Sequence, residues 1–461
     1  MKYHIWTYGC QMNTADSQLL ISELERTGLR AAADPTESDL YIINTCVVRQ
    51  SAENKAYSRL QQLKRYKEDN PAKIIALMGC LVGVKDPLRL RKQLPHVDVF
   101  LPPSEPQPLL QFLNDRNIEA ISREEDQLRL AERYAIQDGE LLLPMEEQGQ
   151  LVSAHVPVVY GCSHACSFCI IPFRRGIERS RSVGKITAHV RSLAQQGVKE
   201  VTLLGQIVDR YGVDIPDGPN LAQLLRVVHR EAEECGLERI RFLTSHPNWM
   251  TEELLETVAE LPKVMPQIEV PVQSGDDEVL ARMKRGYRVQ DYRKLVETIR
   301  SIIPQVAIHT DIIVGFPGES DAQFQHTYDL LAELKLDKAH LARYSPRPHT
   351  VSARRMEDDV PEAVKKIRHQ RLDDLQKRVV AEINQHHLGE TVQVLVEDTQ
   401  RDKWRGRTPQ NKLVFFDDER DWRGKLVEVQ ITWTGPWSMQ ARLSDANWQP
   451  NGHRETISLT A

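Results

Sequence analysis

Apolar runs and amphipathic stretches alternate along the first part of the chain. Segments of helical period cover residues 14–28, with Thr14 as the expected N-cap and Gly28 as the stop, and residues 51–70. Continuous apolar runs predict four strands, at 2–9, 39–46, 73–80 and 97–102. Fully apolar strands separated by helices are typical of a parallel sheet with helices on both faces.

A second alternation of strands and helices begins near residue 152. The apolar runs predict six strands, at 153–160, 200–205, 239–245, 267–273, 306–315 and 338–346. Helical segments such as 185–197, 251–261 and 321–334 separate them, and 361–387 is expected to form one long helix. Right-handed crossovers wrap parallel strands into a curved sheet, so six such units predict a partial α/β barrel.

The pattern changes again after Gly389. Short alternating strands between turn signals, at 391–398, 412–417, 425–433 and 438–443, predict a small all-β barrel of the OB type. Residues 104 to about 150 are rich in Pro, Glu, Gln and Arg and read as a connecting region. The expected domains are therefore 1–140, 148–385 and 386–448.

Composition limits the function classes without choosing one. The chain has 461 residues, too many for one core, with 27% charged and 41% hydrophobic residues, as in soluble globular proteins. Its net charge of −5 gives no overall attraction to nucleic acid, so RNA binding would need local basic patches. We find no secretory signal and no apolar run long enough to span a bilayer, so we expect a cytoplasmic protein without membrane contact.

Seven cysteines are present, an odd number that favours metal or redox chemistry over a disulfide framework. Cys162, Cys166 and Cys169 lie in the stretch GCSHACSFC, directly after the first predicted barrel strand. Ligands bind at the carboxyl edge of parallel α/β sheets, so this loop is expected at a site. The spacing allows a Cys3His zinc site, with His164 or a distant histidine, or a [4Fe–4S] cluster with one open iron.

A second set of three cysteines is dispersed along the chain. Cys10, Cys46 and Cys80 each end a predicted parallel strand of the first domain. If those strands are neighbours, the three thiols converge at one edge of the sheet and form a shared metal site. Cys235 matches no motif and is expected to be a plain thiol.

The stretch CSHACSFC matches the Cys-x3-Cys-x2-aromatic-Cys signature of radical S-adenosylmethionine (SAM) enzymes. The chain resembles the methylthiotransferase branch of that superfamily over nearly its whole length. Within the branch it is most similar to members that convert N6-isopentenyladenosine in tRNA to its 2-methylthio form. The motifs that carry this resemblance are GCQMNTADS, NTCVVRQSAENKA, MGC, GCSHACSFCIIPFRRGIERSR, TSHP, VPVQSGDDEVLARMKRGY, TDIIVGFPGE and YSPRPHT.

The resemblance implies SAM and two [4Fe–4S] clusters as cofactors, with SAM bound at Cys162, Cys166 and Cys169 and an auxiliary cluster at Cys10, Cys46 and Cys80. One SAM would methylate a sulfur on the auxiliary cluster, and a second would supply the radical that takes the C2 hydrogen of the base. The implied partners are the tRNA anticodon stem-loop, an electron-donor protein and an iron–sulfur carrier.

Alternative readings stay open at this point. Sibling enzymes modify threonylcarbamoyladenosine in tRNA or a ribosomal-protein aspartate. Ile207, Asp209 and Arg210 depart from the branch, because this chain has LLGQIVDRYG where its relatives usually carry LLGQNVNSYG. A non-catalytic RNA-binding protein with structural zinc is the alternative of a different class, and it predicts bound zinc and no SAM cleavage.

Polar residues near the predicted barrel strand ends are candidates for SAM contacts, since the cofactor needs donors and acceptors for its ribose, carboxylate and adenine. Each polar residue could instead cap a helix or brace a loop. Phe168, which could shield the cluster or line the cofactor pocket, could instead be part of the core, and Arg285 could instead be a solvated charge at a helix end. His246 and His309 are expected to be structural. The cofactor-binding candidates are Phe168, Gln206, Ser245, Gln273, Ser274, Arg285, Thr310, Asp311 and Arg343.

Two basic stretches are candidates for RNA contact. FRRGIERSRS follows the cysteine loop, and RDKWRGRTPQNK lies in the last domain, which resembles the RNA-binding TRAM domain. The alternative for the first stretch is a solvated charged loop. The candidate residues are Arg174, Arg175, Arg179 and Arg181 in the first stretch, and Lys403, Trp404, Arg405 and Arg407 in the second.

Overall fold

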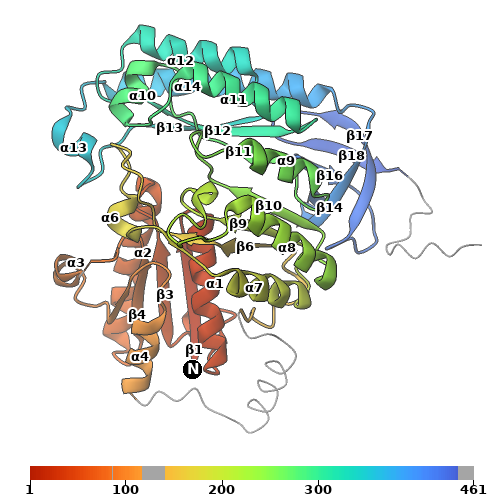
Figure 1. Ribbon diagram of the computed structural model, residues 1–461. Helices are drawn as coiled ribbons and strands as arrows, with labels where there is room; N and C mark the ends of the chain where they lie inside the picture. Colours follow the sequence, from red (N-terminus) through yellow and green to blue (C-terminus); the bar gives the residue numbers. More distant parts are fainter. Residues whose placement is uncertain (86, 117–140, 445–461) are drawn as a thin grey trace, which may run out of the picture.

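The computed structural model describes residues 1–85, 87–116 and 141–444. Figure 1 shows an amino-terminal α/β domain below a curved α/β sheet, with a small β-barrel against the far side of that sheet. The predicted α/β class with a carboxyl-terminal barrel is thus confirmed. Most of the expected connecting region and the end of the chain lie outside the described residues.

The amino-terminal domain contains a parallel sheet, as predicted. Within the described residues the sheet has five strands in the order β2-β1-β3-β4-β5. The strands are β1 (Lys2–Tyr8), β2 (Arg30–Ala31), β3 (Leu40–Thr45), β4 (Ile74–Gly79) and β5 (Val99–Leu101). The accompanying helices are α1 (Gln11–Arg26), α2 (Gln50–Asp69), α3 (Leu88–Gln93), α4 (Gln107–Asp115) and the 3-10 turn η1 (Pro35–Glu37).

Two local predictions in this domain were wrong. Helix α1 begins at Gln11 with Cys10 as its N-cap, not at Thr14, because the Asn13 side chain accepts a hydrogen bond from the Cys10 amide at 3.3 Å. Helix α4 forms inside the expected connecting region, because Leu109 and Leu113 lie on one helical face and become buried.

The central domain is a partial barrel of six parallel strands within the described residues, as the pattern predicted. Strands β6-β9-β10 and β11-β12-β13 form two hydrogen-bonded groups, joined by a bridge between Ile240 and Val264. The strands are β6 (Ser153–Pro157), β9 (Glu200–Leu204), β10 (Arg239–Leu243), β11 (Gln267–Glu269), β12 (Ala307–Val314) and β13 (Lys338–Arg343). The first predicted strand is interrupted, since β7 (Val159–Tyr160) leaves the sheet and pairs antiparallel with β8 (Arg179–Ser180).

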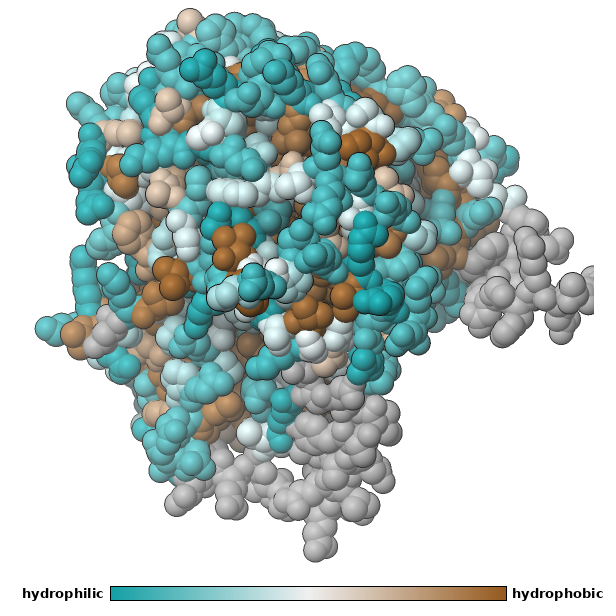
Figure 2. Space-filling model, in the orientation of Figure 1, coloured by the Kyte–Doolittle hydropathy of each residue, from teal (hydrophilic) through white to brown (hydrophobic). Residues whose placement is uncertain are grey.

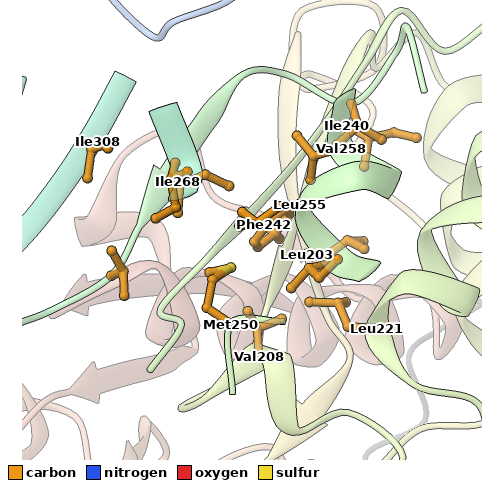
Figure 3. Close-up of a cluster of buried hydrophobic side chains, with 14 of the residues drawn as sticks. Leu203, Val208, Leu221, Ile240, Phe242, Met250, Leu255, Val258, Ile268 and Ile308 are labelled. Carbon is orange, nitrogen blue, oxygen red and sulfur yellow. The ribbon is translucent and has the colours of Figure 1, made fainter. Parts of the chain in front are cut away.

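Helices cover the outer face of this sheet and bury a continuous apolar layer. Figure 3 shows Leu203, Phe242 and Leu255 in that layer, where full burial of each side chain stabilises the fold by roughly 1.5–3 kcal/mol. The helices of the central domain, not all of which lie on that face, are α6 (Ile171–Arg175), α7 (Val183–Gln195), α8 (Leu221–Cys235), α9 (Glu252–Glu260), α10 (Asp277–Met283), α11 (Val289–Ile302), α12 (Asp321–Leu334), α13 (Val351–Arg355), α14 (Glu362–Gln385) and the 3-10 turn η2 (Val208–Arg210).

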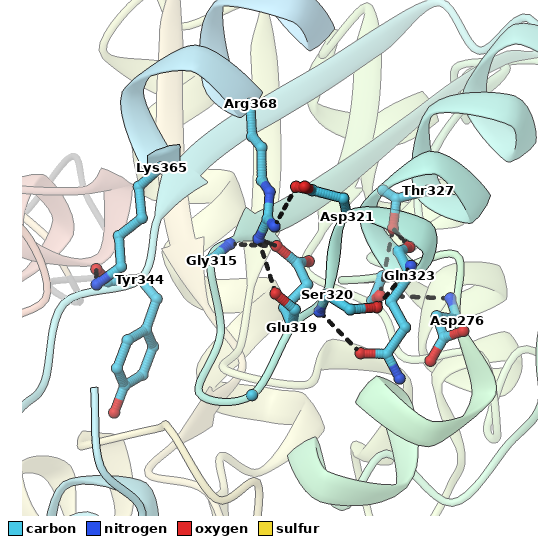
Figure 4. A network of polar contacts seen from close by, with 12 residues as sticks. Asp276, Gly315, Glu319, Ser320, Asp321, Gln323, Thr327, Tyr344, Lys365 and Arg368 are labelled. Carbon is cyan, nitrogen blue, oxygen red and sulfur yellow. Dashed lines mark hydrogen bonds and ion pairs between the residues drawn. The ribbon is translucent and has the colours of Figure 1, made fainter. Parts of the chain in front are cut away.

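A buried ion pair fixes the loop that follows β12. Arg368 on α14 donates to Glu319 at 2.7 Å, and Glu319 in turn accepts the Gly315 amide at 2.7 Å (Figure 4). The loop therefore cannot swing away from α14 without leaving charges unpaired in the interior. It carries the buried Phe316, whose ring lies edge-on to Phe168 at 6.4 Å, so the network supports the residue next to Cys169.

The last domain is a closed barrel in the order β14-β15-β16-β18-β17. It packs against the amino-terminal end of the central strands, where Arg239 donates to the Arg407 carbonyl at 2.7 Å and Arg241 to that of Thr408 at 3.0 Å. Its strands are β14 (Thr391–Gln400), β15 (Lys403–Arg407), β16 (Leu413–Phe416), β17 (Leu426–Thr434) and β18 (Met439–Leu443). β15 was not predicted as a strand, because its charges obscured the alternation.

The surface is mostly polar. The face seen in Figure 2 is dominated by hydrophilic residues, with apolar ones scattered in small groups. Among the residues described, no helix has both the length and the apolar character needed to cross a membrane.

Candidate functional site

Cys10, Cys46 and Cys80 follow β1, β3 and β4, which are adjacent in the sheet. Because these strands are parallel and in register, their ends bring the three thiols together at one edge. The Cys46 amide donates to the Tyr8 carbonyl at 2.9 Å, and the Cys46 thiol interacts with those of both Cys10 and Cys80. Cys46 and Cys80 are buried, whereas Cys10 is half-buried. We call these three residues the first cysteine site.

Glycines make the close approach of these cysteines possible. A side chain on Gly9 would lie 2.9 Å from the Cys46 Cβ, and one on Gly79 would lie 2.3 Å from the Asn44 Oδ1. Gly79 also has a φ of +98°, which glycine tolerates far better than other residues. The glycine before Cys10 and the one before Cys80 are therefore part of the site's construction.

A buried arginine from the central domain reaches the first cysteine site. Arg175 Nε donates to the Cys80 Sγ at 3.2 Å, and its Nη2 donates to Asp16 at 2.7 Å. The Cys46 thiol, acting as donor, lowers the pKa of both neighbouring thiols, that of Cys10 to about 6, and the Arg175 charge adds to this in both cases. Hydrogen bonds to the other two thiols raise the pKa of Cys46. These contacts therefore stabilise the thiolate form of Cys10 and Cys80 relative to that of an isolated cysteine.

Cys162, Cys166 and Cys169 lie on the loop that follows β7, at the carboxyl edge of the barrel. Gly161, with a φ of +70°, allows the Ile177 carbonyl to approach its backbone, since a Cβ there would lie 2.0 Å from that oxygen. Burial raises the pKa of Cys162 to about 11 and that of Cys169 to about 12. We call these residues the second cysteine site.

A second buried arginine serves this site in the same way. Arg285 Nη1 donates to the Cys166 Sγ at 3.2 Å, its Nε donates to the Tyr287 hydroxyl at 2.9 Å, and its Nη2 donates to the Pro271 carbonyl at 3.0 Å. The guanidinium is thus held beside the thiol by two further partners. Our expectation of a SAM contact is compatible with this position, although three of its donors are engaged.

Aromatic rings form one wall of the second cysteine site. His164 lies 4.7 Å from His246 and 5.2 Å from Trp249, and both contacts are edge-on. Burial and the charge of Arg285 lower the pKa of His246 to about 2, so this imidazole is neutral. His164 and His246 were not among the predicted cofactor contacts, although the spacing of His246 and Trp249 in TSHPNW was visible in the sequence.

Several buried polar atoms near the second site have no partner among the described residues. They are the Ser245 hydroxyl, the Nε2 atoms of His164 and His246, and the Oδ1 of Asp209. Burial raises the pKa of Asp209 to about 7. Buried polar atoms are nearly always hydrogen-bonded in folded proteins, so these unsatisfied groups are candidates to bond a polar ligand beside the second cysteine site.

Ile207, Asp209 and Arg210, which depart from the family pattern, lie beside the aromatic wall of the second cysteine site and do not line an open pocket. Ile207 packs with Cys162, Asp209 accepts the His246 amide at 3.0 Å, and Arg210 forms a two-pronged ion pair with Glu178 at 2.7 and 2.9 Å. They therefore shape the surroundings of the second cysteine site.

The predicted SAM-contacting residues divide into two groups. Ser274 and Thr310 are fully buried and bonded within the fold, to Thr327 and to the Val272 amide respectively, so neither faces a ligand space. The other candidates lie at the carboxyl edge of the barrel or beside the second cysteine site. These are Phe168, Gln206, Ser245, Gln273, Arg285, Asp311 and Arg343.

Two of these edge residues have unusual environments. Gln273 has a φ of +74°, a strained conformation that is common at functional sites. Burial raises the pKa of Asp311 to about 6, against the opposing charges of Arg285 and Arg49. Arg49 belongs to the amino-terminal domain, so its charge faces the barrel across the domain boundary.

A cleft of about 590 Å³ lies between the amino-terminal domain and the carboxyl edge of the barrel, and none of the six cysteines lines it directly. Its lining includes Val48, Arg49, Gln50 and Ser51, directly after Cys46, and Phe168, directly before Cys169. Basic side chains outnumber acidic ones on its walls. The basic residues are Arg49, Arg343, Arg347, Lys365 and His369, and the acidic ones are Asp358 and Glu362.

The structure breaks up the first predicted RNA-contacting group. Arg175 is buried, so it cannot form part of an exposed rim. Arg181 is engaged with the Pro157 carbonyl at 2.7 Å. Arg179 is exposed and Arg174 half-buried, and these two remain candidates for contact with RNA.

The second predicted RNA-contacting group lies on β15, where acids of the same barrel balance its charges. Lys403 pairs with Asp417, Arg405 with Asp398 and Arg407 with Glu397. Trp404 is half-buried and donates to the Asp418 carbonyl at 3.1 Å. The exposed tryptophans of this domain are instead Trp433 and Trp437.

Comparison with known proteins matches all three parts of the chain. The family model described as Radical SAM superfamily matches residues 156–331, Uncharacterized protein family UPF0004 matches 2–102, and TRAM domain matches 385–443. A tRNA-2-methylthio-N(6)-dimethylallyladenosine synthase of Roseiflexus sp. (strain RS-1) is 46% identical, covering 96% of this chain and 90% of that protein. The protein of the same name from Herpetosiphon aurantiacus is 44% identical, covering 96% and 97%.

The chain belongs to this synthase family. Among solved structures, the radical SAM methyltransferase TsrM from Kitasatospora setae matches with a TM-score of 0.54 at 14% identity, covering 76% of this chain and 74% of that one, which supports the fold alone. Membership of the radical SAM superfamily and of this synthase family implies SAM and [4Fe–4S] clusters as cofactors.

The residues present fit these cofactors. Each site offers three thiols and a buried arginine that donates to one of the sulfurs, as expected around a negatively charged cluster. In the part of the chain that the structure describes, no three Cys, His, Asp or Glu side chains are gathered as around a single metal ion.

Proposed function

We propose that this protein is a radical SAM enzyme that installs a methylthio group at C2 of N6-isopentenyladenosine in tRNA. The observation that carries the proposal is the cleft between the amino-terminal domain and the barrel, which is lined by residues adjoining Cys46 and Cys169. A substrate in that cleft would therefore lie close to the segments that carry both sites. The methylthio group and the hydrogen abstraction would then meet at a single carbon.

Each set of cysteines has a proposed role. Cys162, Cys166 and Cys169 hold the SAM-binding [4Fe–4S] cluster, and Cys10, Cys46 and Cys80 hold the auxiliary one. When bound, the cluster of the second cysteine site would supply one-electron cleavage of SAM. This cleavage yields a carbon radical able to take hydrogen from an unactivated C–H bond. No acid–base pair can remove that hydrogen readily, so the chain needs no general base for this step.

The protein's own side chains position and shield the reaction. Phe168, supported by Phe316, limits water access from the cleft to the second cysteine site. The unpartnered Ser245 hydroxyl and the Gln273 backbone lie at the barrel edge, where SAM polar groups would bind. On the cleft walls Lys365 pairs with Asp358 and Arg343 with Glu362, and Arg347 donates to Gln50 and the Val48 carbonyl. We therefore assign Arg49 to the phosphates that flank the target base.

The TRAM match and the family names support tRNA as the substrate. We further propose that the anticodon stem-loop is the bound part, because an adenine in a single-stranded loop is unstacked at little cost. The same proposal includes two protein partners, an electron donor and an iron–sulfur carrier. It also includes action in the cytoplasm and a division into domains at 1–140, 148–385 and 386–448.

Nucleoside mass spectrometry of cellular tRNA, with and without this protein, tests the function. In cells that lack the protein, we expect 2-methylthio-N6-isopentenyladenosine to disappear from tRNA and its unthiolated precursor to accumulate. Unchanged levels of both nucleosides would refute the proposal. Loss of the methylthio form of threonylcarbamoyladenosine instead would move the substrate to the sibling class.

A further inference from the structure

Arg175 connects the two cysteine sites. It is the last residue of α6, shortly after Cys169 in the chain, yet its side chain points into the first cysteine site. Only 5% of its surface is exposed. Its Nε donates to the Cys80 Sγ at 3.2 Å, and its Nη2 donates to the Asp16 Oδ2 at 2.7 Å.

The Arg175 guanidinium is held in place by an equally buried acid. Asp16 lies on α1 with 1% exposure, and its other oxygen accepts from the Ser104 hydroxyl at 2.5 Å. Arginine stays protonated in proteins, so this pair is an ion pair and its geometry is fixed at both ends. One donor of the planar fork is thereby aimed at the Cys80 sulfur.

The backbone on either side of Arg175 is tied to both sites. The Cys162 amide donates to the Gly176 carbonyl at 3.0 Å, which anchors the end of α6 to the second cysteine site. Ile170, at the other end of α6, is buried in one cluster with Cys80 and Leu81 of the amino-terminal domain. The arginine is therefore delivered to Cys80 by the loop that carries the second site.

We propose that Arg175 is a positioning residue for the first cysteine site: it holds the Cys80 sulfur and raises the reduction potential of the iron–sulfur cluster bound by Cys10, Cys46 and Cys80. This rests on the proposed function, which assigns a cluster to those cysteines. Reduction adds negative charge to a cluster, and an N–H donor on a ligating sulfur stabilises that charge. Removal of the donor therefore lowers the potential.

The test uses the full chain with Cys162→Ala, Cys166→Ala and Cys169→Ala, so that only the first site can hold a cluster. After anaerobic reconstitution with iron and sulfide, iron is counted and the cluster is titrated against potential by electron paramagnetic resonance. Into this background go Arg175→Met, Arg175→Lys, the pair Arg175→Met with Asp16→Asn, and Arg174→Met as the neighbouring control. The paired variant avoids leaving Asp16 buried without its partner.

We expect Arg175→Met and the paired variant to shift the potential to more negative values. Arg175→Lys should shift it less, because lysine keeps the charge but lacks the fork that reaches Cys80 and Asp16 together. Arg174→Met should leave the potential unchanged. Loss of iron from the Arg175 variants, with circular dichroism unchanged, would also support a role in holding Cys80.

A cluster whose iron content and potential are the same in all variants overturns the proposal for Arg175. A background chain that binds no iron at all contradicts the proposed function instead, since the first site would then hold no cluster. If Arg175→Met and the paired variant both unfold, the Arg175→Lys titration decides, and an unshifted potential there overturns the proposal.

Discussion

The two cysteine sites use similar parts but are assembled differently. Each begins with a glycine–cysteine pair, and each has one sulfur that accepts from a buried arginine at 3.2 Å. The second site comes from one short loop, whereas the first comes from three strand ends that meet only in the folded sheet. The first site therefore depends on sheet register and domain packing, and the second on the conformation of one loop.

The largest effects are expected from removing each set of thiols in turn. Replacing Cys162, Cys166 and Cys169 by Ala should abolish reductive SAM cleavage. Replacing Cys10, Cys46 and Cys80 by Ala should remove about half of the bound iron, keep SAM cleavage and abolish methylthio transfer. Iron and sulfide analysis and chromatography of 5′-deoxyadenosine measure both. Loss of SAM cleavage from the second variant would contradict this division of roles.

Gly79 tests the dependence of the first site on the sheet. Gly79→Ala should destabilise the amino-terminal domain by about 2–5 kcal/mol, because a left-handed backbone and a steric clash combine. Gly149→Ala is the matched control, since Gly149 also has a positive φ but nothing lies within 4 Å of the position that an added methyl group would occupy. Gly149→Ala should lower the free energy of unfolding by only about 1–2 kcal/mol. Urea denaturation and iron content check both, and equal losses would refute the steric argument.

Arg285 tests the corresponding arginine of the second site. Arg285→Met removes the donor to Cys166, and loss of such a supporting contact typically costs about 10–100-fold in metal affinity or activity. We expect that loss in the rate of SAM cleavage, with the first site still filled with iron. Arg293→Met, which breaks an exposed ion pair with Glu333, is the control and should change the rate little.

Asp209 gives the smallest predicted effect, a pH dependence. Burial raises the pKa of Asp209 to about 7 from 3.8. The unfolded chain therefore releases this proton at a lower pH than the folded protein does, so the free energy of unfolding falls as the pH rises from about 4 to about 7. Asp209→Asn should remove the fall and stabilise the fold at pH values above about 7 by about 1–3 kcal/mol, with little difference near pH 4. Thermal denaturation across this range measures it.

Asp214 supplies the control of opposite sign. Partial burial by itself would raise the pKa of Asp214, but hydrogen bonds from Ser180 lower it overall. Its contribution is present above the unfolded pKa and lost in acid, so Asp214→Asn should not stabilise the protein at high pH. A similar gain in both variants would mean that removal of negative charge, not burial of Asp209, is responsible.

Much of the architecture was predictable from local pattern. The apolar strands at 40–45 and 74–79, the helix at 321–334 and the barrel after residue 390 all follow from periodicity that neighbouring residues alone determine. The long strand expected at 153–160 failed, because β7 leaves the sheet to pair with β8. That pairing partner lies well along the chain and leaves no local signal.

Charged residues were the least predictable part of the candidate sites. Arg175 stands among other arginines in FRRGIERSR, so composition suggested an RNA-facing rim, but its partners Asp16 and Cys80 come from another domain. Arg405 and Arg407 likewise found acids on the neighbouring strand β14. Whether a charge faces solvent, an acid or a thiol depends on which distant segments fold beside it.

The order of residue types along the chain was enough to indicate the two groups of three cysteines, the strands that carry them and the family. Folding alone determined that one cleft adjoins segments of both sites and that an arginine from one site's loop donates to a sulfur of the other. The reason is that periodicity and motif spacing act over a few residues, whereas contacts between domains depend on how whole sheets pack.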